Sequence, residues 1–329
     1  MNLFLCGLRR SGTTILYDAL GEDPALRRYY EPLREEAETV GGGSGARDVD
    51  LGAEMRELRE RFRTERYPEL QIELFNWGGP RAPELELEAD LPPHVRDWLA
   101  ELIASAPEVA IKETRLQHKL GALAELDPEA AVVHLVRDPR AVTASMLLGR
   151  RRRIDLYPDA EAFFTARTGR RLWSSRRISE ELLTPLDIGD DVPDFLRPLL
   201  VWKAAFEAMH RDGPHLFGDR YALVRLEDLR ADPGRELARV YELIGRPLPD
   251  GVTTWARENI RRGGDVHYAD DPRWARAARL LGMEPAIERA GYGDVLELED
   301  APGEPLDLDP PAARSRLAGF MGRARRRLG

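Results

Sequence analysis

The sequence predicts an α/β fold in which a central parallel sheet is flanked by helices. Short apolar runs are each followed by a stretch of helical character. The run AVVHLV at 131–136 is almost continuously apolar, as expected for a strand that is buried on both faces of a parallel sheet. An alternating order of strands and helices is typical of doubly wound domains, in which ligands bind beyond the carboxyl ends of the strands.

The individual elements follow from these runs and from the turn residues between them. Strands are predicted at 2–6, 108–112, 131–136 and 221–226, with a further strand or sheet edge at 70–76. Helices are predicted after residue 14 and at 53–66, 94–106, 116–126, 140–150, 158–182, 193–212 and 233–245. The acidic, Gly-rich stretch 34–52 predicts a loop.

The chain of 329 residues is predicted to form one main domain over 1–299. Long helical and loop insertions are expected at about 34–106 and 150–215. The remaining stretch, 300–329, is rich in Pro and Asp and then basic, which predicts a tail that ends in a basic helix.

Composition excludes several classes of protein. Hydrophobic residues make up 43% of the chain, enough for a sizeable core, and the net charge of −9 argues against a nucleic-acid binder. The single Cys6 excludes a disulfide framework and a zinc site built from cysteines. No run of about 18 apolar residues occurs, so no stable membrane insertion is expected. Because the chain enters folded structure without a signal-like segment, a cytoplasmic location is expected.

A phosphate-binding loop is predicted at GLRRSGTT, from Gly7 to Thr14. It lies between an expected strand and an expected helix, where backbone N–H groups and the helix dipole favour an anion. The hydroxyls of Ser11, Thr13 and Thr14 add possible donors. Triphosphate sites place a Lys directly after the second Gly, whereas Thr13 stands there and the cations lie upstream at Arg9 and Arg10. A P-loop kinase or NTPase acting on a small molecule is therefore the alternative rather than the leading hypothesis.

A second anion site is predicted after the buried strand 131–136. Arg137 follows this strand directly, and Ser145 lies eight residues further on, about two turns into the next helix. Both residues are expected at the sheet edge that carries the phosphate loop. Taken alone, the pattern is also that of an Arg–Asp pair that caps a helix.

With these motifs, the chain resembles the sulfotransferases that use 3′-phosphoadenosine 5′-phosphosulfate, and their carbohydrate sulfotransferase branch in particular. The resemblance rests on Arg10-Ser11-Gly12-Thr13-Thr14, on the Arg137 and Ser145 pair, on VRLEDLRADP at 224–233 and on RWARAARLLGMEPAIERAGYGD at 273–294. It implies a P-loop-type domain and a transfer of a sulfuryl group to an acceptor hydroxyl, with no metal. The acceptor it implies is a sugar or a glycosylated small molecule.

The resemblance also implies which residues bind the donor. The 5′-phosphosulfate would lie on Arg9 and the 10–14 loop, and the 3′-phosphate on Arg137 and Ser145, in two separate pockets. A third, Gly-rich basic loop is matched loosely by RENIRRGGD, which gives Arg261, Arg262 and Gly263 as candidates. Leu226 stands where many family members have a Tyr, so the adenine contact of that Tyr is not expected here.

Three residues are predicted to carry the chemistry. Arg10 would stabilise the departing phosphate, and Lys112, in AIKETR at the end of a predicted strand, would support the sulfuryl oxygens. Glu31 in YYEP is the first candidate for the base that takes the acceptor's proton, with Glu113 next and His118 and His267 behind. The alternatives are an ordinary surface Lys at 112 and a surface or helix-end Glu at 31. Only three of the 49 basic residues are Lys, which makes Lys112 conspicuous.

Overall fold

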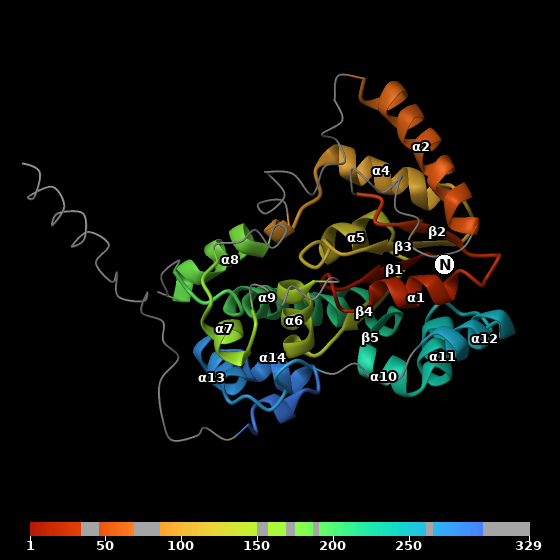
Figure 1. The fold of residues 1–329 in the computed structure, drawn as a ribbon. Coiled ribbons are helices and arrows are strands. Elements are labelled where there is room, and N and C mark those ends of the chain that lie inside the picture. The colour runs from red at the N-terminus through yellow and green to blue at the C-terminus, as the bar shows by residue number, and fades with distance from the viewer. Residues whose placement is uncertain are drawn as a thin grey trace, which may run out of the picture.

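A computed structural model confirms the parallel α/β architecture (Figure 1). It describes residues 1–33, 46–68, 86–149, 157–168, 175–186, 191–260 and 266–298. Five strands form one sheet in the order β2-β3-β1-β4-β5, and every neighbouring pair is parallel. Their bounds are β1 Leu3–Cys6, β2 Arg27–Tyr30, β3 Val109–Glu113, β4 Ala131–Val136 and β5 Tyr221–Arg225.

Helices connect the strands and cover the sheet. In the amino-terminal half they are α1 Thr13–Leu20, α2 Ala46–Arg66, α4 Pro93–Ala104, α5 Leu120–Leu126 and α6 Pro139–Leu148. These are followed by α7 Ala160–Thr165, α8 Ser175–Leu183, α9 Leu196–Phe217, α10 Leu226–Ala231, α11 Pro233–Leu243, α12 Asp250–Asn259, α13 Arg273–Leu280 and α14 Glu284–Arg289. Short 3₁₀ turns lie at Thr184–Leu186, Gly218–Arg220 and Gly293–Val295.

Alternate strand residues face the two layers of helices. Leu3, Leu5 and Val133 pack with α1, α11 and α12 in one apolar cluster. Phe4 and Val132 point to the opposite face, where they pack with α4, α5 and α9 in another. A third cluster joins α6–α9 to α13 and α14. Burial on both faces explains why the central strands read as continuous apolar runs.

The structure corrects several sequence predictions. Residues 46–52 belong to α2 rather than to the expected loop 34–52, and the expected helix 158–182 is two helices, α7 and α8. Strand β2 and helix α10 were not expected. The predicted strand at 70–76 and the tail from 300 lie outside the described residues. The division into domain and insertions stays a prediction.

Candidate active site

The carboxyl ends of all five strands converge on one edge of the sheet. In spatial order, this edge carries Glu31 after β2, Lys112 in β3, the phosphate loop after β1, Arg137 after β4 and helix α10 after β5. Parallel pairing brings together residues that are distant in the chain, such as Tyr30 with Lys112 and Val136 with Arg225. The edge therefore contains every candidate group that the sequence placed at a strand end.

The phosphate loop, residues 7–12, is held in a tight turn before α1. A Cβ atom on Gly7 would lie 2.4 Å from the carbonyl oxygen of Leu135, so only glycine fits beside β4. Gly12 has φ 93°, and Arg10 adopts a positive φ of 77°, which is unusual for a residue with a side chain. The Gln117 amide donates to the carbonyl oxygen of Gly7 at 2.9 Å and ties the loop to the turn after β3. Backbone strain held in this way by the surroundings is typical of functional loops.

Leu226, the position at which the resemblance led us to expect no adenine contact, packs against this loop. It is buried, and a Cβ atom on Gly12 would lie 2.6 Å from its Cδ1. The first residue of α10 thus packs directly on the loop backbone. This gives Leu226 a packing role.

Arg10, Ser145 and Arg137 form one continuous group of polar contacts. The Nε atom of Arg10 donates to the Ser145 hydroxyl at 2.8 Å, and the Arg137 guanidinium donates to the carbonyl oxygen of Arg10 at 3.2 Å. The sequence analysis placed these residues in two separate pockets. In the structure the two predicted phosphate elements meet directly.

Arg137 has a cationic neighbour that the sequence analysis missed. Burial, together with the charge of Arg230 in α10, lowers the pKa of Arg137. The Nε atoms of both side chains are buried and have no hydrogen-bond partner among the described residues. Arg230 lies one helical turn after Leu226, on the side of α10 that faces the loop, within a segment the sequence had already singled out. Two neighbouring half-buried arginines, each with a buried Nε atom that lacks a partner among the described residues, mark this region as favourable for an anion.

Lys112 and Glu31 form a buried ion pair, between the Lys Nζ atom and the Glu Oε1 atom. The Lys112 side chain is only 1% exposed, and its ammonium group lies 4.2 Å from the centre of the Tyr30 ring. The backbone N–H of Glu31 donates to the carbonyl oxygen of Lys112 at 2.7 Å. The alternatives of a surface Lys and a surface Glu are therefore wrong.

Glu113, the second candidate base, has its carboxylate occupied by the backbone. It accepts from the N–H of Thr114 at 2.7 Å and from that of Leu33 at 3.3 Å. Burial, and then the nearby charge of Glu31, raises the pKa of Glu113. These contacts favour Glu31 as the base. Of the two histidines, His118 lies before α5, where burial lowers its pKa, and His267 lies between α12 and α13.

Arg9 points into a different ion-pair group. Its guanidinium contacts Glu86 at 2.5 Å, and the same carboxylate oxygen accepts from Nε of Arg115 at 3.0 Å. All three side chains are buried. The assignment of Arg9 to donor binding stays a prediction, as do those of Ser11, Thr13 and Thr14. Arg261, Arg262 and Gly263 lie outside the described residues.

Metal-binding clusters and membrane-spanning helices are both absent from the described residues. No group of three or more His, Cys, Asp and Glu side chains among them is arranged to hold a metal ion. None of their helices combines the length and the apolar character that crossing a bilayer requires.

Comparison with known proteins shows which family the first part of the chain resembles. The model of the sulfotransferase family matches residues 2–153. This segment contains the phosphate loop, Glu31, Lys112, Arg137 and Ser145. The match covers a little under half of the 329 residues, and over this segment the chain is similar to the sulfotransferase family.

Named relatives agree with the family match. The chain is 31% identical over 169 residues to carbohydrate sulfotransferase 1 of Danio rerio, covering 48% of this chain and 33% of that protein. It is 26% identical over 261 residues to carbohydrate sulfotransferase 4 of Mus musculus, covering 73% of this chain and 62% of that protein. The matches thus span one third to under two thirds of these relatives' lengths. Sulfotransferase STF9 from Mycobacterium avium superposes with a TM-score of 0.47 at 16% identity, over 91% of this chain and 77% of that one.

The contact between Gly12 and Leu226 predicts a difference between two glycine substitutions. Gly12→Ala should cost about 1–3 kcal/mol more unfolding free energy than Gly245→Ala. Both glycines have positive φ, but a Cβ atom at Gly245 would meet open space. Urea unfolding of the two variants measures the difference, and equal losses would contradict the packing described for Leu226.

Proposed function

We propose that this protein transfers a sulfuryl group from 3′-phosphoadenosine 5′-phosphosulfate to an acceptor hydroxyl on a sugar or a glycosylated small molecule. The family match supports the reaction, and the family implies this donor. The names of the carbohydrate sulfotransferases that the chain resembles support a sugar acceptor. The observation that carries the proposal is the order of groups along the sheet edge.

That order matches the order of tasks in a sulfuryl transfer. A carboxylate (Glu31) and an ammonium group (Lys112) lie at the ends of β2 and β3, the phosphate loop follows β1, and Arg137 follows β4. The sheet edge thus presents, in order, a base, a cation for the sulfuryl oxygens, a binding loop for the 5′-phosphate and a cation for a second phosphate. Transfers of this kind depend mainly on positioning and charge stabilisation, which this arrangement provides.

The residues present fit the proposed donor. Arg137 and Arg230 are adjacent guanidinium groups whose buried Nε atoms have no partner among the described residues. Burying like charges side by side is unfavourable unless an anion compensates them. Ser145 and the amides at the start of α1 supply uncharged donors next to them. These residues would hold the phosphates of the donor.

Within this site, each side chain has a task that its contacts support. Bound there, the donor supplies a sulfuryl group, whose bond to the bridging phosphate oxygen breaks as the acceptor oxygen bonds to sulfur. Arg10 and the loop amides stabilise negative charge on the departing phosphate. Lys112 pairs with Glu31 and offers positive charge to the sulfuryl oxygens. Glu31 accepts the proton that the acceptor hydroxyl loses.

Ligand binding tests the donor class first. Adenosine 3′,5′-bisphosphate should raise the melting temperature, because a ligand that binds only the folded state stabilises it by about 2.7 kcal/mol at 100 times Kd. ATP with Mg²⁺ should give a smaller shift, because Thr13 stands where triphosphate sites have Lys. Transfer of radiolabelled sulfate to a panel of mono- and oligosaccharides then tests the reaction. A shift with ATP–Mg²⁺ alone would favour the kinase or NTPase alternative instead.

Glu31→Gln should lower turnover about 100-fold or more while the affinity for adenosine 3′,5′-bisphosphate stays the same. The substitution keeps the size of the side chain but removes the proton acceptor. Steady-state rates and calorimetry measure the two quantities. Asp23→Asn is the matched control, because it also removes a buried charge from an ion pair, here with Arg246 beyond the far end of α1. Near-normal turnover in Glu31→Gln would exclude Glu31 as the base.

Arg137→Ala should weaken the binding of adenosine 3′,5′-bisphosphate by about 1–3 kcal/mol and change the affinity for 5′-AMP much less. Arg230→Ala should act in the same direction. Arg220→Ala serves as control, because this guanidinium contacts the carbonyl oxygens of Pro128 and Ala130 before the opposite end of β4. Calorimetry with both nucleotides makes the comparison. Equal losses for the two nucleotides would contradict the assignment of the 3′-phosphate to Arg137.

A further inference from the structure

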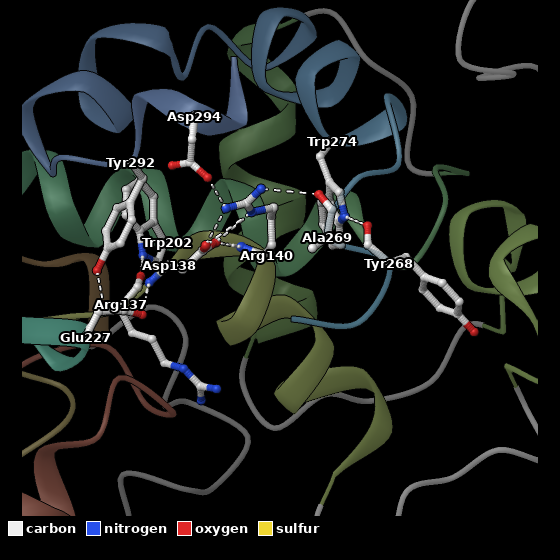
Figure 2. A network of polar contacts seen from close by, with 10 residues as sticks. All are labelled: Arg137, Asp138, Arg140, Trp202, Glu227, Tyr268, Ala269, Trp274, Tyr292 and Asp294. Carbon is white, nitrogen blue, oxygen red and sulfur yellow. Dashed lines mark hydrogen bonds and ion pairs between the residues drawn. The ribbon is translucent and has the colours of Figure 1, made fainter. Parts of the chain in front are cut away.

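The backbone around Arg137 is held from two sides (Figure 2). The indole N–H of Trp202 in α9 donates to the carbonyl oxygen of Arg137 at 2.9 Å. The next N–H along the chain, that of Asp138, donates to Oε1 of Glu227 at 3.2 Å. The peptide group that joins Arg137 to Asp138 is thus held at both its carbonyl oxygen and its N–H, and this sets the direction in which the Arg137 side chain leaves the strand end.

Glu227 is in turn held by Tyr292, near the end of the described chain. The Tyr292 hydroxyl donates to the other carboxylate oxygen, Oε2, at 2.6 Å. Burial and the charge of Glu227 raise the pKa of Tyr292, so the hydroxyl keeps the proton that it donates. The Arg225 guanidinium lies 4.4 Å from the centre of the Tyr292 ring and helps to fix the ring.

A second contact joins the same two segments. Arg140 pairs with Asp138 at 2.7 Å and with Asp294 at 2.5 Å, and it donates to the carbonyl oxygen of Ala269 at 3.2 Å. Asp138 also accepts from the backbone N–H of Arg140 and so caps α6, the helix that carries Ser145. The loop between β4 and α6 is therefore attached to residues about 150 positions later in the chain.

The Arg137 guanidinium itself takes no part in this network. Figure 2 shows its side chain extending away from the labelled cluster, and it contacts the carbonyl oxygen of Arg10 in the phosphate loop. Of the two carboxylates that raise the pKa of Arg137, Glu227 has a larger effect than Asp138. Both of its oxygens are nevertheless engaged, one by Asp138 and one by Tyr292. Without the Tyr292 hydroxyl, one oxygen would be released to pair with Arg137.

We propose that Tyr292 is a positioning residue for the 3′-phosphate site, which it serves by holding Glu227 away from the Arg137 guanidinium. The hydroxyl keeps the carboxylate on the backbone of Asp138 and leaves the cation available to an anionic ligand. Asp294 supports the same loop through Arg140. This inference rests on the proposed function, because it assumes that Arg137 receives the 3′-phosphate.

The test compares two tyrosine variants and two nucleotides by calorimetry. Tyr292→Phe should raise Kd for adenosine 3′,5′-bisphosphate about tenfold, the effect of roughly one hydrogen bond, and leave Kd for 5′-AMP within about twofold. Tyr241→Phe is the matched control. It also removes a buried hydroxyl that donates to a carboxylate, here Asp23 at 3.0 Å, beyond the far end of α1. It should change neither Kd.

A double-mutant cycle separates positioning from general loss of structure. Glu227→Gln keeps an acceptor for the Asp138 N–H but removes the charge that competes for Arg137. In that background, Tyr292→Phe should add less than about a twofold further loss. If Tyr292→Phe does not fold, Asp294→Asn replaces it in the test, because the Asp294 side chain is 62% exposed. This variant should show the same selective loss of affinity for the bisphosphate.

The outcomes distinguish this inference from the proposed function. A wild-type protein that binds the bisphosphate no better than 5′-AMP would overturn the 3′-phosphate site itself. A wild-type protein that discriminates, combined with equal losses in Tyr292→Phe and Tyr241→Phe, would overturn the role of Tyr292 alone. A full tenfold loss on adding Tyr292→Phe to Glu227→Gln would also overturn it.

Discussion

The site depends on the parallel pairing of five short strands. In a parallel sheet every strand ends at the same edge, so residues that follow different strands become neighbours whatever their separation in sequence. Tyr30 pairs with Lys112, and Val136 pairs with Arg225. These two registers place Glu31 beside the Lys112 ammonium group, and α10 beside Arg137. Because both faces of the central strands are covered by helices, the charged groups at this edge lie in a partly dry environment, where their mutual interactions are strong.

The carboxylates of the site compensate the positive charge at the β2–β3 end of the sheet edge better than at the β4–β5 end. Glu31 pairs with Lys112, and Glu86 pairs with both Arg9 and Arg115. Glu227 is occupied by a tyrosine hydroxyl and a backbone N–H. The buried charge near Arg137 and Arg230 therefore has less compensation within the described residues than the charge near Glu31. A ligand anion would complete the balance at the Arg137 end, and an uncharged hydroxyl suits the Glu31 end.

The sequence predicted what depends on local pattern and missed what depends on packing. Four strands were found because their residues are continuously apolar, whereas β2 reads RRYY and is a strand because Tyr29 is buried and Arg28 lies over the Tyr17 ring. The expected helix 158–182 ends early at α7, where the Asp194 carboxylate binds the hydroxyl and the N–H of Thr168. Motif spacing was enough to predict that Arg10, Arg137 and Ser145 lie at the same edge of the sheet, where the structure places them in contact. The roles of Arg230 and Leu226 follow from the placement of α10 against the phosphate loop, which spacing alone does not reveal.

The network around Glu227 also shows why the family match and the functional site differ in extent. The match ends at residue 153 and contains the ends of the first four strands. However, the direction of the Arg137 side chain is set by Trp202, Glu227 and, through Glu227, Tyr292. In the proposed site, the matched segment thus supplies all the ligand-binding groups except Arg230, and the later part of the chain also fixes the orientation of Arg137. Because a phosphate site gains its strength from pre-oriented donors, the motif needs both parts of the chain to act as a binding site.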